Sequence, residues 1–172
     1  MKKKNLKTIR KNVGYVFQDA DSQLFMSTVF DDVAFAPRNY GMSEAEVNEK
    51  TMEALKVVHI EQLKDKQIYK LSGGEKKLAS IATILSTEPD VILMDEPSVA
   101  LDPKNRRNLI NILNQLNQAK IIASHDLNMI MDTCERTILL SDGKVIKDGN
   151  TKEILLDKEL MEESGLELPL GY

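Results

Sequence analysis

The chain has 172 residues, of which 42% are hydrophobic and 29% charged, and its formal net charge is -4. This length suits one domain with a sizeable core, and the composition excludes a fibrous, low-complexity or largely disordered chain. The negative charge argues against a general nucleic-acid binder, and the sequence contains no apolar run long enough to span a bilayer.

The first eleven residues, MKKKNLKTIRK, carry six lysines and arginines. Such a cluster either contacts phosphates or an anionic membrane surface, or forms a solvated polar lead-in to the first strand. We prefer the lead-in and assign this cluster no function.

Cysteine and histidine usage limits the redox and metal chemistry. A single cysteine, Cys134, excludes an internal disulfide and indicates a cytosolic protein; we interpret it as a small core residue rather than a nucleophile. The two histidines, His59 and His125, lie far apart with no cysteine cluster. No zinc-type ligand spacing exists.

The first half of the chain predicts a strand, a loop and two helices. NVGYVF, residues 12–17, is apolar and rich in β-formers, and a helix opens at Ser43 with a Ser-x-x-Glu capping box. A second box opens at Ser72 with Glu75 as its partner, so a helix begins at the glycines of LSGGE. The predicted buried positions are Val47, Thr51, Ala54, Leu55 and Val58 in the first helix and Leu78, Ile81, Ala82 and Leu85 in the second.

The second half predicts further strands and one long helix. VILMD, residues 91–95, is a continuous apolar run typical of a strand covered on both faces. Asp102 caps the next helix, whose first residue is Pro103, and KIIAS, residues 120–124, is a short strand. RTILLS (136–141) and KVIKDG (144–149) flank Asp142-Gly143, a strong hairpin signal, whereas residues from about 157 onward show no clear periodicity. These elements predict an α/β domain with a largely parallel sheet and a small antiparallel hairpin.

Asp95 and Glu96 stand where the apolar strand ends, at the edge where open α/β sheets bind ligands. For this pair alone, a solvated strand end is the alternative. Three further segments favour a site: LSGGEKK, whose helix N-terminus suits a phosphate, SHD with His125 after a strand, and Gln18, an amide able to orient water or complete a metal's shell. Taken singly, these are also explained as a helix cap, a turn residue and a loop glutamine.

The ordered set of Gln18, LSGG, VILMDE, SVALD and His125 resembles the nucleotide-binding subunit of an ATP-binding cassette (ABC) transporter over most of the chain. LSGG matches the signature motif, VILMDE the Walker B segment, SVALD the D-loop and His125 the switch histidine. The stretch VGYVFQDADSQLFMSTVFDDVAFAPRNYGM is similar to cobalt and nickel importers and energy-coupling-factor vitamin importers. The implied fold is a P-loop NTPase-like α/β domain, residues 1–156, with a helical subdomain at about 40–85 and a C-terminal tail at 157–172.

The resemblance also implies roles for individual residues. Two subunits of this family hold ATP between them, so Ser72, Gly73, Gly74 and Glu75 contact the nucleotide of a second ATPase subunit, identical or different. Asp95 and Gln18 hold Mg2+, Glu96 acts as general base, His125 contacts the γ-phosphate, and Asp102 couples the two sites. A transmembrane transporter subunit is the other implied partner, at the cytoplasmic face of the membrane; no nucleic acid is expected. Phe25, Met26 and Phe30 are candidate contacts there, with core packing as the alternative for each.

No glycine of this sequence begins a G-x-x-x-x-G-K-S/T phosphate loop. The family carries that loop and its strand N-terminal to the glutamine loop, so we expect this chain to be truncated. Losing three charge-assisted hydrogen bonds costs about 5 kcal/mol and weakens ATP binding roughly a thousandfold. We expect the chain alone neither to bind ATP tightly nor to hydrolyse it, and to be marginally stable or self-associating.

Two departures from the family pattern concern contacts near the nucleotide. Glu75 stands where glutamine is most frequent, which places a carboxylate near a nucleotide. Val99 and Ala100 replace the commoner Ala-Gly of the D-loop, which affects its flexibility.

Three functions remain open from the sequence. The first is an ABC ATPase subunit that powers metal or vitamin import. The second is a module that donates its signature motif to a partner ATPase without hydrolysing ATP itself. The third is a non-transport ABC protein that acts on nucleic acid or ribosomes, which only the basic N-terminus supports.

Overall fold

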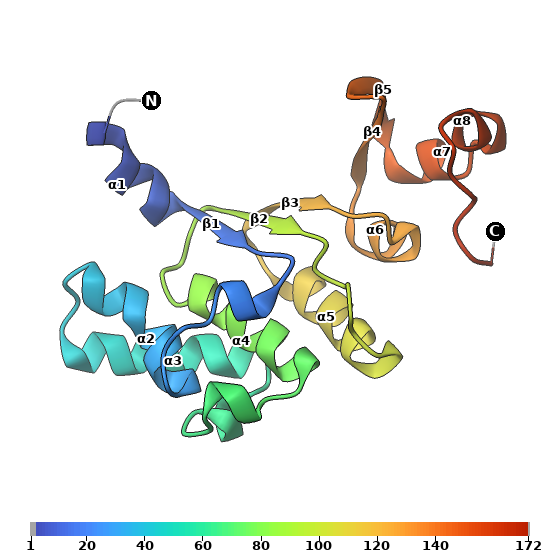
Figure 1. The fold of residues 1–172 in the computed structure, drawn as a ribbon. Coiled ribbons are helices and arrows are strands. Elements are labelled where there is room, and N and C mark those ends of the chain that lie inside the picture. Colours follow the sequence, from blue (N-terminus) through green and yellow to red (C-terminus); the bar gives the residue numbers. More distant parts are fainter. Residues whose placement is uncertain (1–2, 172) are drawn as a thin grey trace. The chain divides into compact units, whose positions relative to one another are not determined.

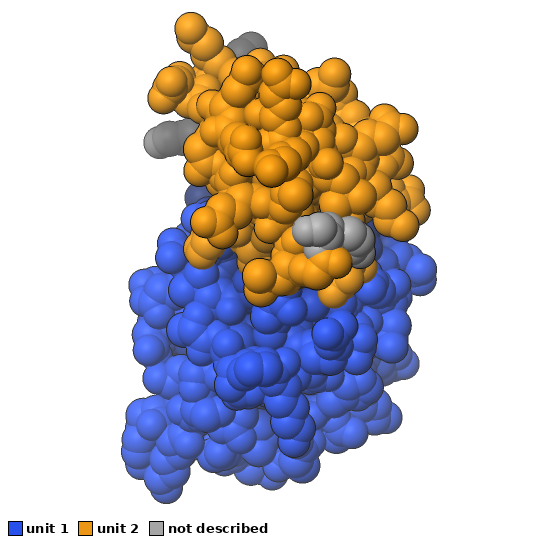
Figure 2. Space-filling model, turned by 90° about the vertical axis from the view of Figure 1, so that its right-hand side faces the viewer, with its two compact units in different colours: residues 1–123 blue, residues 124–172 orange. Residues whose placement is uncertain are grey.

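The computed structural model describes residues 3–171, whose chain contacts separate into two compact units, Met1–Ala123 and Ser124–Tyr172 (Figure 2). The first unit contains a parallel sheet with helices, and the second a hairpin with short helices (Figure 1). In chain order the helices and strands of the first unit are α1 (Lys3–Asn12), β1 (Val13–Val16), α2 (Val29–Asn39), α3 (Glu44–Val57), α4 (Gly73–Leu85), β2 (Val91–Asp95), α5 (Pro103–Gln115) and β3 (Ala119–Ala123).

The sheet of the first unit has the order β1-β2-β3, and both pairings are parallel. Val13 is in register with Val91, and Val91 with Ala119, so the three strands end at the same edge. A Cβ on Gly14 would lie 2.0 Å from Ile84 of α4, so glycine permits the close approach of β1 to that helix. This edge-aligned sheet confirms the predicted α/β architecture.

Helices α2, α3 and α4 pack against one another and form the helical portion of the first unit. Both predicted capping boxes are present, Ser43 with Glu46 and Ser72 with Glu75. The positions predicted to be buried in α3 and α4 are buried: Val47, Thr51, Ala54, Leu55, Val58, Leu78, Ile81, Ala82 and Leu85.

The prediction that the VILMD strand is covered on both faces is wrong. Ile92 and Met94 are buried toward the helices, but a row of apolar side chains in register on the other face, Tyr15, Leu93 and Ile121, is not. Tyr15 is 42% and Ile121 63% exposed. Helices α2 to α5 lie on one side of this sheet (Figure 1), so its other face keeps apolar surface in solvent.

The second unit contains α6 (Leu127–Thr133), β4 (Arg136–Ser141), β5 (Lys144–Asn150), α7 (Thr151–Leu155) and α8 (Lys158–Glu163). The hairpin is antiparallel as predicted, and its turn residues Asp142 and Gly143 have φ of 50° and 72°, which suits a tight hairpin turn. A small core includes Met129, Leu139, Ile154, Leu155 and Met161.

Several helices lie where no element was predicted. Helix α1 occupies the segment interpreted as a polar lead-in, of which residues 1–2 lie outside the described part, and α8 lies in the segment that lacked periodicity. Helix α2 lies in the predicted loop. Thr28 caps it by accepting a hydrogen bond from the Asp31 amide. The sequence did not predict this helix because it contains Pro37, and proline usually breaks a helix.

Candidate functional site

The N-terminus of α4 carries the residues predicted to meet a phosphate. Ser72 caps the helix by accepting a hydrogen bond from the Glu75 amide (3.3 Å), and its own amide donates to the Glu75 carboxylate (2.7 Å). Ser72 and Gly73 are exposed, and a Cβ on Gly73 would have no neighbour within 4 Å. The first turn of α4 is therefore open on its outer side, where its amides and helix dipole suit an anion.

The negative charge of the Glu75 carboxylate is balanced by a neighbouring lysine. It lies 3.0 Å from the Lys66 ammonium group. The hydrogen bond from the Ser72 amide and the Lys66 charge lower the pKa of Glu75. The extra charge expected at this position is thus offset by Lys66, a residue that sequence reasoning missed.

The Asn105 side chain of α5 connects the SVALD segment to α4, the helix that begins with the LSGG glycines. Asp102 caps α5 by accepting hydrogen bonds from the amides of Lys104 and Asn105 (both 2.9 Å), and the Asn105 side chain donates to the other Asp102 oxygen. A Cβ on Gly74 would lie 2.5 Å from the Asn105 side-chain nitrogen. A larger residue at position 74 would displace the Asn105 side chain, which is the group that joins Gly74 of α4 to Asp102.

Asp95 and Glu96 lie at the C-terminal end of β2, half-buried. The Asp95 carboxylate accepts a hydrogen bond from the Tyr15 hydroxyl of β1 (3.4 Å). The Glu96 amide donates to the Ala123 carbonyl (2.8 Å), and its φ is 44°. A left-handed conformation at a residue with a side chain is uncommon and concentrates at functional sites.

Gln18 follows β1 and is exposed, with its backbone carbonyl held by a buried lysine. Lys77 of α4 is 3% exposed, and its ammonium group donates to the carbonyls of Gln18 (2.6 Å) and Phe17 (3.0 Å). Burial lowers the pKa of Lys77, while the carboxylates of Asp19 and Asp95 raise it. Sequence reasoning missed Lys77, although its place four residues before the buried Ile81 could have indicated that it faces inward.

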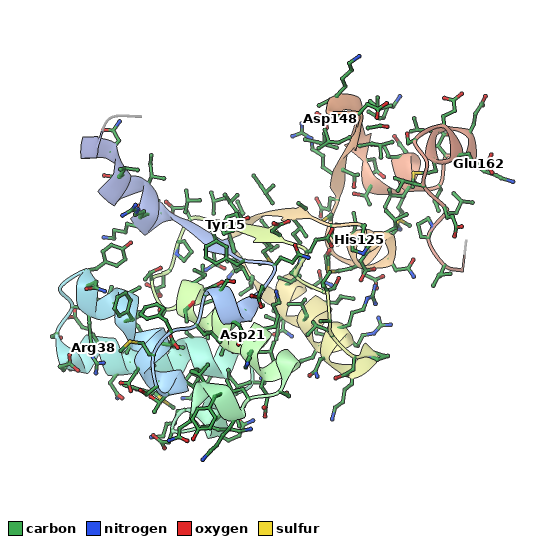
Figure 3. The ribbon with its side chains drawn as sticks, viewed as in Figure 1. Tyr15, Asp21, Arg38, His125, Asp148 and Glu162 are labelled. Atoms are coloured by element: carbon green, nitrogen blue, oxygen red, sulfur yellow. The ribbon has the colours of Figure 1, made fainter. Side chains whose placement is uncertain are left out.

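His125 belongs to the second unit, two residues after the end of β3 (Figure 3). Its carbonyl accepts from the Leu127 amide as α6 begins (3.1 Å). The contact of His125 with a γ-phosphate stays a prediction.

Metal and membrane features are limited in the described residues. No three His, Cys, Asp or Glu side chains of residues 3–171 gather in a group able to hold a metal ion by themselves. Within the same part of the chain, no helix has the length and apolar character needed to cross a membrane.

Comparison with known proteins identifies relatives of this chain. Residues 1–99 match the family model described as ABC transporter. An ABC transporter ATP-binding protein of Geobacter sulfurreducens is 49% identical over 166 residues, which cover 96% of this chain and 67% of that protein. The energy-coupling factor transporter ATP-binding protein EcfA of Carboxydothermus hydrogenoformans is 42% identical, over 96% of this chain and 62% of that protein.

A solved structure agrees with these matches. The structure of cbiO1 from Clostridium perfringens, described as part of the ABC transporter complex cbiONQ, superposes with a TM-score of 0.84 at 37% identity. It covers 94% of this chain, and this chain spans 66% of it. The chain spans 69% of an ABC transporter ATP-binding protein of Gloeobacter violaceus and 55% of one of Synechocystis sp..

Proposed function

Because the chain belongs to the family of ABC transporter ATP-binding proteins and is close to its EcfA and CbiO members, we propose that it serves as the ATP-binding and ATP-hydrolysing subunit of an ABC importer. The observation that carries this proposal is the open first turn of α4, where Ser72 and Gly73 are exposed. Such a turn suits the γ-phosphate of a nucleotide held by another subunit.

A complete ATP site needs a phosphate loop in addition to the motifs of these 172 residues. The sequence holds the signature, the Walker B carboxylates and the D-loop, but no phosphate-loop motif. We infer that Ser72, Gly73 and Gly74 act on nucleotide bound elsewhere, with Glu75 keeping the cap in place. Asn105 then links this nucleotide contact to the D-loop, because it lies close to Gly74 and its side chain donates a hydrogen bond to Asp102.

For the hydrolysis step we assign Glu96 as the general base that polarises the attacking water. Its left-handed backbone, tied to β3 through the Ala123 carbonyl, supports this role because it fixes the direction in which the side chain leaves the strand end. Gln18 orients the same water, and His125 stabilises charge that develops on the γ-phosphate.

The donor set fits Mg2+ only in combination with a nucleotide. Mg2+ binds proteins through one or two carboxylates together with substrate phosphates, and Asp95 at the strand end supplies one such carboxylate while Gln18 supplies an amide oxygen. When bound, Mg2+ neutralises charge on the phosphates. The Asp95 carboxylate also accepts a hydrogen bond from the Tyr15 hydroxyl (3.4 Å), which orients it at the strand end.

The partners we propose are a second ATPase subunit and a transmembrane subunit, and the cargo is a cobalt or nickel ion or a vitamin. The support is the likeness to EcfA and to cbiO1 of a cbiONQ complex. Exposed Phe25 and Phe35, whose rings contact edge to face, offer an apolar surface for a transmembrane subunit.

The test is ATP turnover by the assembly that copurifies with the tagged chain from its own cells. We expect Glu96→Gln to lower turnover at least about a hundredfold. Gly73→Arg should lower it as well, because the new side chain meets open space in the fold but blocks the approach of a nucleotide. Glu159→Gln, at an exposed position of α8, serves as the control.

Unchanged turnover in both variants would overturn the proposal. Loss with Gly73→Arg but not with Glu96→Gln would favour a module that only donates its signature motif. Recovery of RNA or ribosomes that salt removes would favour the non-transport function. The isolated chain should show no turnover; activity that Glu96→Gln abolishes would contradict that prediction.

A further inference from the structure

The loop that follows β1, residues 17–24, is fastened to helix α4 by side chains along its whole length. Lys77 donates to the carbonyls of Phe17 and Gln18 at its start. The Gln23 side chain donates to the Ser80 carbonyl (2.7 Å) and the Thr83 hydroxyl (2.9 Å) near its end. Lys76 pairs with Asp21 between them (2.6 Å), in the turn where Figure 3 labels Asp21.

These links are not equivalent. The Lys76–Asp21 pair lies at the surface, with the Asp21 side chain 65% exposed. Ion pairs at the surface contribute little to the free energy of folding. Lys77 is buried and donates to two main-chain carbonyls at the start of the loop. A hydrogen bond from a buried charged group is stronger than one between neutral groups. Removing the Lys77 ammonium group would leave the two part-buried carbonyls without a hydrogen-bond donor.

Burial of a lysine is costly for the fold. Desolvation lowers the pKa of Lys77, and an apolar side chain of similar length would fill the same space without this cost. The two hydrogen bonds from Lys77 to main-chain carbonyls of the loop offset this cost and connect the loop to α4. The role of Lys77 follows from its hydrogen-bond partners, because one of the two carbonyls is the backbone carbonyl of Gln18.

We propose that Lys77 is a positioning residue that makes the loop of residues 17–24 and the signature helix α4 one rigid element, so that Gln18 is placed by the same helix that presents Ser72 and Gly73. This inference rests on the proposed function, in which Gln18 serves one ATP site and the α4 N-terminus another. A nucleotide that contacts α4 in one site thereby sets the position of Gln18 in the other.

The first test is hydrogen–deuterium exchange on the full chain. Lys77→Met should raise exchange of the amides in residues 17–24 at least about tenfold, because it removes both hydrogen bonds to the loop. The amides of α3 and of the C-terminal half of α4 should change less than twofold. Lys56→Met, the same substitution at an exposed position of α3, should change neither. If Lys77→Met does not fold, Gln23→Met tests the second link; exchange should rise at the end of the loop and at the Phe17 amide, which donates to the Gln23 side chain (3.1 Å).

The second test is ATP turnover by the copurified assembly. Lys77→Met should lower kcat at least about tenfold with KM within twofold, since Gln18 acts on water and metal rather than on nucleotide binding. Lys77→Arg, which keeps a cationic donor, should restore a large part of kcat and the protection of residues 17–24.

The outcomes separate the two proposals. Unchanged exchange in the loop, or unchanged kcat for Lys77→Met where Glu96→Gln abolishes turnover, would overturn the positioning role and leave the proposed function standing. Turnover that survives Glu96→Gln would overturn the proposed function, and the role of Lys77 in catalysis with it.

Discussion

Ala100 of the D-loop has φ of 62°, a left-handed conformation that costs a residue with a Cβ about 1–2 kcal/mol. Two residues later Asp102 caps α5, so the loop must turn sharply to enter the helix. The sequence already set Ala100 apart, because the family more often has glycine there. The structure gives the physical reason, since glycine adopts this conformation without a steric cost.

We therefore expect Ala100→Gly to raise the free energy of unfolding by about 0.5–1 kcal/mol, since relief of strain outweighs the added entropy of the unfolded chain. Urea denaturation at constant m-value is the measurement. Gly143→Ala, at φ of 72° in the hairpin turn, should have the opposite sign. A loss of stability in Ala100→Gly would show that the D-loop backbone is not strained.

Thr51 of α3 offers a second test at a single side chain. It is fully buried, and its hydroxyl has no hydrogen-bond partner in the described residues. Thr51→Val should raise the free energy of unfolding by about 1 kcal/mol, because the shape is kept and an unsatisfied polar group is removed.

The matched control is Thr151→Val. That buried hydroxyl is hydrogen-bonded to the hydroxyl of Thr137 (2.9 Å), so the same substitution should lower stability. Equal effects of the two substitutions would contradict the assignment of Thr51 as unsatisfied.

At the scale of elements, the start of α4 combines a capping box with an ion pair. Glu75→Ala removes both and should lower the free energy of unfolding by about 1 kcal/mol. Glu75→Gln keeps the hydrogen bond to the Ser72 amide and should lose less.

The pH dependence of this pair follows from the lowered pKa of Glu75. The contribution of its charge is complete above the ordinary value of 4.5 and is lost as the pH falls through the lower pKa of the folded state. The stability difference between the unmodified chain and Glu75→Gln should therefore shrink between pH 6 and roughly pH 3 in urea titrations. A difference that is constant over this range would exclude a charge contribution from Glu75.

The elements that the sequence predicts well are those with a local signal. Capping boxes at Ser43 and Ser72, the Asp102-Pro103 helix start and the Asp142-Gly143 turn each depend on neighbouring residues alone. The motif order likewise predicted the family and fold. What the sequence could not give depends on packing between distant segments: helix α2 across Pro37, the open sheet face, and the burial of Lys77.

At the scale of the molecule, the two compact units differ in the size of their cores. The unit of residues 124–172 has few buried apolar side chains, and its hairpin exposes Ile138, Leu140 and Val145. A unit this small is marginally stable by itself.

We expect the amides of β4 and β5 to exchange with solvent deuterium at lower denaturant than those of α3 and α4. Leu155→Ala, which removes a buried side chain of the second unit, should lower the protection of the hairpin and leave α3 and α4 unaffected. Simultaneous loss of protection in both units would show that they unfold as one.

The register of the parallel sheet dictates an order of events during synthesis. Val13 pairs with Val91, so β1 leaves the ribosome long before its partner strand β2 has been translated. Closing that distance costs chain entropy, whereas α3 and α4 with their local caps can form at once. During this interval Tyr15 of β1 and Phe17, which follows the strand, have no β2 to pack beside, and exposed apolar segments of this kind are ones that chaperones recognise. Slower translation between residues 17 and 91 would prolong that exposure, and co-translational aggregation should rise with it.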